Sequence, residues 1–135
     1  MKALGRHLLV EYSGCDRATL SEVPRIQALM EEAARVSGAT IVQVCFHQFN
    51  PYGVSGVVVI AESHLAIHTW PEHGYASVDI YTCGDSVDPW KAHEFLTREL
   101  GAADTETNEL RRGQLGDESV PSKYPSTALP IVLHS

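Results

Sequence analysis

Side chains able to do chemistry gather in residues 54–84, which read VSGVVVIAESHLAIHTWPEHGYASVDIYTCG. Ser63 directly follows Glu62 in this stretch, and His68 and Cys83 come later. A serine hydroxyl next to a strained amide can attack the preceding carbonyl and convert the amide into an ester. An imidazole can act as the base, and a thiol can supply a proton. We therefore interpret this group as a candidate site for acyl and proton transfer at the Glu62–Ser63 bond.

Two alternating runs, residues 64–70 and 75–83, position these groups. Period-two alternation is typical of strands with one apolar and one polar face. The short PEHG link between the runs predicts a hairpin whose register sets Cys83 opposite Glu62, with His68 on the same face as Cys83. This polar face carries His64, Ala66, His68 and Trp70 from the first run and Tyr75, Ser77, Asp79, Tyr81 and Cys83 from the second.

The position of Ser63 breaks the alternation. Residues 57–61 form a short apolar run that predicts a strand buried on both faces. A strict pleat continuing through Ser63 would place its side chain on the Leu65 face, away from His68. We therefore predict a bulge or a tight turn at Glu62–Ser63, with local backbone strain as a further hypothesis.

Composition limits the class of protein. A chain of 135 residues, 44% apolar and 20% charged, fits one globular domain, residues 1–135. No apolar run reaches the roughly 20 residues of a membrane span, and the N-terminal stretch reads as a strand rather than a signal peptide, so we expect a cytoplasmic protein without membrane contact. The net charge of −7 disfavours nucleic acid and suits a cationic small molecule.

The spacing of cysteine and histidine does not predict a disulfide framework or a metal site. The three cysteines, Cys15, Cys45 and Cys83, contain no C-x-x-C pair. On a strand, His64 and His68 would lie about 13 Å apart, too far for one ion. We therefore expect no metal cofactor.

Two helices are predicted from capping residues and apolar spacing. The first has Ser21 as its N-cap and ends at Gly38. The second starts at Asp88, with proline at its first helical position, and ends at Gly101.

Further strands are predicted at residues 5–12, 40–49 and, more weakly, 104–112. From Gly113 onward we expect irregular structure, with residues 131–133 docking on the body. In the strand at 40–49, alternation assigns one face to Ile41, Gln43, Cys45 and His47 and the other to Val42, Val44, Phe46 and Gln48.

This order of elements predicts an α+β fold, a two-layer sandwich in which a mostly antiparallel sheet carries two helices on one face. The other face bears histidine, tyrosine, cysteine and tryptophan, and no further element remains to cover it. We therefore expect a homodimer whose sheets face each other.

The strings AESHLAIHTWPE (residues 61–72) and YTCGDSVDPWKA (residues 81–92) resemble prokaryotic S-adenosylmethionine decarboxylase proenzymes, which are pyruvoyl-dependent. The resemblance runs from Gly5 to about Leu100. It departs at Ala61, where the family commonly has serine, and it weakens after Leu100.

The resemblance implies that the chain cleaves itself between Glu62 and Ser63, giving a β chain (1–62) and an α chain (63–135). Ser63 would become a covalent pyruvoyl group, whose keto carbon forms a Schiff base with the substrate amine and takes up the electrons released as CO₂ leaves. The assembly implied is a homodimer of α/β heterodimers.

The same resemblance implies roles for the remaining site residues. His68 would be the base for processing, Ser55 would assist it, and Cys83 would be the proton donor in decarboxylation. Phe49 would stack on adenine and Glu72 would hold the ribose hydroxyls. We also expect Leu65 and Trp70 to contact the substrate.

The expected reaction converts S-adenosylmethionine into decarboxylated S-adenosylmethionine, the aminopropyl donor for spermidine. One alternative is a paralogue with the same chemistry acting on L-arginine or L-ornithine. A cationic amino-acid side chain would be bound by an acidic pocket in place of the Phe49 and Glu72 arrangement. The presence of Phe49 and Glu72 therefore favours the nucleoside substrate. A second alternative is an unprocessed, non-catalytic dimer that binds a small molecule.

Overall fold

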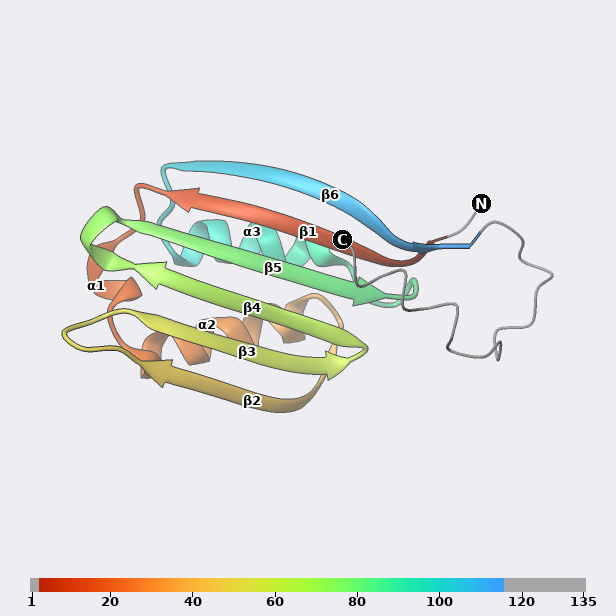
Figure 1. Ribbon diagram of the computed structural model, residues 1–135, viewed down its shortest axis with the longest axis horizontal. Helices are drawn as coiled ribbons and strands as arrows, with labels where there is room; N and C mark the ends of the chain where they lie inside the picture. Colours follow the sequence, from red (N-terminus) through yellow and green to blue (C-terminus); the bar gives the residue numbers. More distant parts are fainter. Residues whose placement is uncertain (1–2, 116–135) are drawn as a thin grey trace.

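A computed structural model describes residues 3–115 and arranges them as a six-stranded sheet with helices on one face (Figure 1). The strands are β1 (Ala3–Ser13), β2 (Thr40–Gln48), β3 (Val54–Ala61), β4 (Ser63–Trp70), β5 (Tyr75–Cys83) and β6 (Asp104–Gln114). Their order is β2-β3-β4-β5-β1-β6, and every neighbouring pair is antiparallel. The predicted α+β sandwich is confirmed.

The helices lie on one side of this sheet. Helix α2 (Val23–Val36) and helix α3 (Pro89–Glu99) pack against each other over the same face (Figure 1). A short helix α1 (Arg17–Leu20) contacts the 3-10 turn η1 (Pro71–His73), which joins β4 to β5. The predicted cap of α3 is confirmed, because the Asp88 side chain accepts a hydrogen bond from the Trp90 amide at 3.0 Å.

The prediction that Ser21 caps the helix at its N-terminus is wrong. Helix α1, which was not predicted, occupies the preceding residues, with Asp16 as its N-cap. The Ser21 hydroxyl donates to the carbonyl of Arg17 at 2.7 Å, so it closes the end of α1. The N-cap of α2 is Glu22, and its side chain makes no capping hydrogen bond.

The core lies between the sheet and the two long helices. Alternate residues of β1, β4 and β5 point into it, as the period-two pattern predicts. Burying each large aliphatic side chain contributes roughly 1.5–3 kcal/mol, and this fixes which sheet face meets the helices. Fully buried members include Leu8, Val10, Tyr12, Ile26, Met30, Leu65, Ile67, Ile80 and Leu96.

Strand β2 departs from the predicted alternation. Ile41 pairs with Ile60 but Gln43 pairs with Val59, so Val42 is an extra residue in a bulge. The bulge moves Ile41 onto the face that packs against the core, whereas the sequence placed it with Gln43 on the other face. Val42 is left 62% exposed.

The predicted interruption at Glu62–Ser63 is confirmed as a tight turn. The chain reverses at Glu62, so Ser63 pairs with Ile60 on one side and with Thr82 on the other. Strand β6 continues to Gln114, beyond the predicted start of the irregular tail. The expected docking of residues 131–133 lies outside the described residues.

Candidate active site

Ser63 and Cys83 meet at one end of the sheet. The Ser63 Oγ lies 3.3 Å from the Cys83 Sγ, and both side chains are half-buried. By its place in β4, Ser63 should point toward the helices, as Leu65 does. Its φ of +111° instead turns the side chain toward Cys83. Such a φ is unfavourable for a residue with a Cβ, by roughly 1–3 kcal/mol, so the backbone at Ser63 is strained.

Gly5 leaves the space that the Cys83 thiol occupies. It pairs with Cys83 across β1 and β5. A Cβ at Gly5 would lie 3.1 Å from the Cys83 Sγ and 2.7 Å from a ring carbon of Tyr81. Sequence reasoning assigned Gly5 no role. The sequence marked Gly5 only as the first residue of the stretch that resembles the family, directly before Arg6-His7.

Ser55 and His68 form a second pair. They are direct cross-strand partners in β3 and β4, and the Ser55 Oγ lies 2.7 Å from the His68 Nδ1. The turn at Glu62 creates this pairing, because it folds β3 back along β4. A hydroxyl held against an imidazole suits proton transfer, the role predicted for both residues.

A cavity of about 310 Å³ opens beside this second pair. The loop after β2 contributes to it and is closed by a hydrogen bond from the Phe49 amide to the Gly53 carbonyl, at 2.8 Å. The cavity is lined by aromatic side chains, among them Phe49 and Trp70, whose ring faces can stack on a planar base or a sulfonium cation. The cavity is lined by Phe49, Tyr52, Gly53, Ser55, His68, Thr69, Trp70 and Glu72. Five of these were predicted site residues, and Tyr52 is an aromatic that the sequence reasoning missed.

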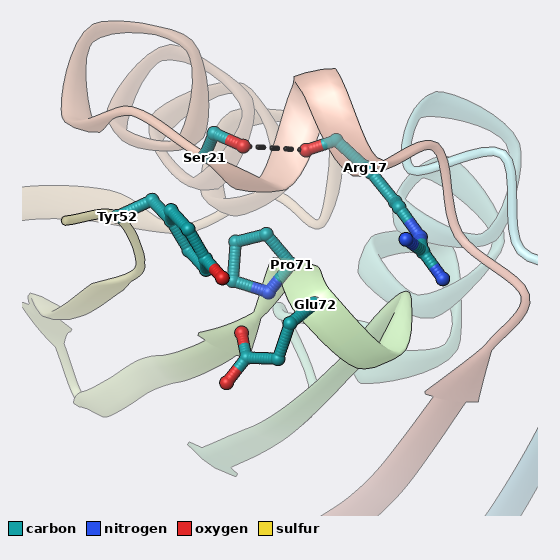
Figure 2. A pocket seen from close by; sticks show the side chains of 5 residues that line it. All are labelled: Arg17, Ser21, Tyr52, Pro71 and Glu72. Carbon is teal, nitrogen blue, oxygen red and sulfur yellow. Dashed lines mark hydrogen bonds between the residues drawn. The ribbon is translucent and has the colours of Figure 1, made fainter.

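A second cavity, of about 280 Å³, adjoins the first and shares Tyr52 and Glu72 with it. Figure 2 shows the Tyr52 ring beside Pro71 at the start of η1, with Glu72 exposed next to it. The Arg17 guanidinium points away from the Glu72 carboxylate (Figure 2). Glu72 can therefore accept hydrogen bonds from hydroxyl groups of a ligand.

The two pairs lie at opposite ends of β4. His68 lies five positions after Ser63, a distance of about 16 Å along a strand. Figure 1 shows the β3–β4 turn and the β4–β5 turn at opposite ends of the sheet. His68 and Cys83 share a face, as predicted. The sequence grouped His68 with Ser63 and Cys83 at the Glu62–Ser63 bond, but within one chain the length of β4 keeps His68 away from that bond.

The other predicted positions divide between the site and the core. Glu62 is exposed at the turn, and Trp70 lines the first cavity. Leu65 is 0% exposed and packs with the core on the helix-covered face. The buried side chain of Leu65 does not support the predicted contact with substrate, which stays a prediction.

A polar cluster was also missed on the sheet face that points away from α2 and α3, called the open face from here on. His7, His64 and Asp79 place one nitrogen or oxygen atom each within 4.8 Å of one another. Arg112 donates to the His7 Nδ1 at 2.8 Å, so the His7 Nε2 carries the proton and cannot act as a metal ligand in this arrangement. Burial is the main cause that lowers the pKa of His7; Asp79 opposes the shift and Arg112 adds to it.

Comparison with known proteins adds the family. The model of the family described as S-adenosylmethionine decarboxylase matches residues 6–113. The chain belongs to the S-adenosylmethionine decarboxylase family. The family match continues past Leu100, where the sequence resemblance weakened, and so includes most of β6.

Relatives within this family are similar over nearly the whole chain. The S-adenosylmethionine decarboxylase proenzyme of Thermotoga maritima is 54% identical over 128 residues, covering 95% of this chain and 98% of that protein. The proenzyme of Moorella thermoacetica is 55% identical over 113 residues, covering 84% and 90%. The crystal structure of the adenosylmethionine decarboxylase from Aquifex aeolicus has a TM-score of 0.83 at 37% identity, covering 90% of this chain and all of that one.

No helix within residues 3–115 is long and apolar enough to cross a membrane.

Proposed function

We propose that this chain is a proenzyme that cleaves itself between Glu62 and Ser63 and then decarboxylates S-adenosylmethionine. The product would be the aminopropyl donor for spermidine. One observation carries the proposal: Ser63 stands at a strained turn with its hydroxyl 3.3 Å from the Cys83 thiol. Strain at a reacting bond raises the energy of the ground state and favours its rearrangement.

Cleavage uses groups of the protein alone. The Ser63 Oγ attacks the carbonyl carbon of Glu62; a C–O bond forms, the C–N bond breaks, and the hydroxyl proton passes through a base to the freed amine. A base then removes the Ser63 α-proton, and the Cβ–Oγ bond of residue 63 breaks with the α-carboxylate of Glu62, the new C-terminus of the 1–62 fragment, as the leaving group. Dehydroalanine is left at residue 63, and its hydrolysis releases ammonia and leaves a ketone.

The resulting pyruvoyl group would supply an electron sink for the loss of CO₂. Residue 63 fits such a group, because it is the first residue of β4, directly after the turn, and has a proton donor beside it. Cys83 would deliver the proton that replaces the lost carboxylate. No step in this scheme requires a metal ion.

A homodimer completes the site in this proposal. Within residues 3–115, the helices leave the open face uncovered, and half-exposed apolar side chains such as Val59 and Trp70 lie on it. Packing two copies face to face, with strands running in opposite directions, would bring the Ser63 end of one subunit onto the His68 end of the other. His68 of one subunit would then serve as the base for Ser63 of its partner, which a single copy cannot achieve across about 16 Å.

The first cavity suits the substrate. Phe49 and Trp70 offer exposed aromatic faces, 46% and 41% accessible, for adenine and for the positively charged sulfonium. Glu72 can accept hydrogen bonds from the ribose hydroxyls. In the dimer, this recognition end would face the reacting end of the other subunit.

Denaturing mass spectrometry of the purified protein tests the proposal. We expect fragments of residues 1–62 and 63–135, the second blocked at its N-terminus by a carbonyl, and an intact Ser63→Ala chain. Release of CO₂ should be fast with S-adenosylmethionine and negligible with L-arginine or L-ornithine. A cleaved Ser63→Ala protein, or a folded wild-type protein that stays full length, would contradict the scheme.

A further inference from the structure

The hydroxyl of Thr82 is an unusual polar group in this core. Thr82 is 0% exposed, and its Oγ1 has no hydrogen-bond partner among residues 3–115. The other two buried threonines of that part of the chain are satisfied. The Thr69 Oγ1 donates to the Leu20 carbonyl at 2.9 Å, and the Thr19 Oγ1 donates to Asp16 at 2.6 Å. A buried hydroxyl without a partner destabilises the fold, so its presence calls for a physical reason.

The position of Thr82 suggests that reason. Thr82 is the direct cross-strand partner of Ser63 in the β4–β5 ladder. Both positions belong to the set whose side chains point toward the helices, as the neighbouring pair Leu65 and Ile80 does. Ser63 would therefore be the natural partner for the Thr82 hydroxyl. The φ of +111° turns the Ser63 Oγ toward Cys83 instead. The Thr82 hydroxyl is therefore left unpaired beside the turn.

We propose that the Thr82 hydroxyl donates a hydrogen bond to the carbonyl oxygen of the Glu62–Ser63 bond during self-cleavage. Attack by the Ser63 Oγ turns this carbonyl carbon tetrahedral and places negative charge on its oxygen. The charge disappears when the C–N bond breaks and the ester carbonyl forms. A donor inside a water-excluded core stabilises such a charge strongly, and removal of one comparable donor slows acyl transfer roughly 10²–10³-fold.

This inference rests on the proposed self-cleavage, and it makes Thr82 a participant rather than a packing residue. A packing residue at this position would be better as valine, because valine has nearly the same shape and no unpaired hydroxyl. If Thr82 acts as a hydrogen-bond donor, serine at this position would preserve the function, because serine keeps the hydroxyl and loses only one methyl group. The two substitutions therefore move cleavage and stability in opposite directions.

The test compares Thr82→Val and Thr82→Ser by following cleavage of newly synthesised chains in a cell-free translation, with gel electrophoresis after synthesis is stopped. Thr82→Val should cleave roughly 100-fold more slowly than wild type, and Thr82→Ser within about threefold of it. The same substitutions placed in the uncleavable Ser63→Ala chain report on the fold. There, Thr82→Val should melt at the reference temperature or above it, and Thr82→Ser slightly below.

Cleavage of Thr82→Val at the wild-type rate would overturn the inference and leave the proposed function intact. Equal slowing of Thr82→Val and Thr82→Ser would also overturn it, because the loss would then follow the methyl group or the fold. A wild-type chain that never cleaves would remove both proposals together.

Discussion

The two ends of the open sheet face are built in different ways. At one end, Ser63 and Cys83 are half-buried on neighbouring strands, and Gly5 and a strained backbone fix how they meet. At the other end, exposed side chains such as Phe49 and Glu72 come from loops and surround a cavity. Bond-breaking chemistry needs groups held in one geometry, whereas ligand recognition tolerates loops on a rigid frame. In the dimer that we propose, one chain would carry the reacting half of one site and the recognition half of the other.

Mixed dimers test most directly whether the two ends act together across subunits. We expect Ser63→Ala homodimers to remain intact and His68→Ala homodimers to cleave very poorly. When the two variants are co-expressed, the His68→Ala chain should be cleaved, because its own Ser63 meets an intact His68 on the other subunit. Mass spectrometry of the separated chains reads this out. Persistence of full-length His68→Ala chains in purified mixed dimers would show that the two ends do not act across subunits.

Removing the thiol tests the chemistry at the Ser63 end. Cys83→Ala should still cleave, because the base for cleavage lies elsewhere. Its rate of CO₂ release per cleaved chain should fall roughly 10²–10⁴-fold, the usual contribution of a positioned proton donor. Denaturing gels establish the fraction cleaved before the rates are compared. Decarboxylation at the wild-type rate would refute the role of Cys83.

Filling the space at Gly5 tests how the thiol is held. In Gly5→Ala, the new methyl group would press on the Cys83 Sγ and the Tyr81 ring, so the thiol must shift. We expect kcat to fall roughly 10–100-fold with little change in KM, because a misplaced donor weakens the chemical step more than binding. Leu4→Ala, at an exposed neighbouring residue, is the matched control. A Gly5→Ala enzyme that matches this control would mean that the space can relax.

Truncating an aromatic group tests the recognition end. Phe49→Ala should raise KM for S-adenosylmethionine roughly tenfold, as expected for the loss of about 1.4 kcal/mol of stacking and cation–π energy. Self-cleavage should be unaffected, since Phe49 supplies neither the nucleophile nor the base of that reaction. Val42→Ala, in the exposed bulge of β2, provides the control. A slower cleavage of Phe49→Ala with unchanged KM would reverse the assignment of the two ends.

The smallest effect concerns His7, near the Ser63 end. Its pKa is lowered in the folded state, mainly by burial, so the unfolded chain binds a proton more readily than the folded one. Stability from this group is therefore complete above about pH 6.5 and falls as the pH drops below that value. Urea unfolding of the Ser63→Ala chain between pH 7 and pH 5 should show this fall, and His7→Gln should make it shallower. An identical pH dependence in both chains would exclude His7 as its source.

Much of the frame could be predicted because its signals are local. Alternation in residues 64–70 and 75–83 placed the polar face correctly, and the hairpin predicted at the PEHG link is confirmed, with Trp70 paired to Tyr75. Asp88 was recognisable as a cap because aspartate directly before a proline at the first helical position can accept a hydrogen bond from the second or third amide of the helix. Helix α1 was missed although Asp16 carries a local capping signal, because its four residues are too few to show an apolar period. The bulge at Val42 was missed because it is decided by the packing of Ile41 against the core.

The sequence by itself determined which residues could react, because residue type and period-two spacing are properties of the chain alone. It determined that Ser63 could not continue a regular strand. Only the tertiary structure decided which groups meet. The reversal at Glu62 put Ser55 against His68, the positive φ at Ser63 put its hydroxyl against Cys83, and a strand of fixed rise per residue kept the two pairs apart.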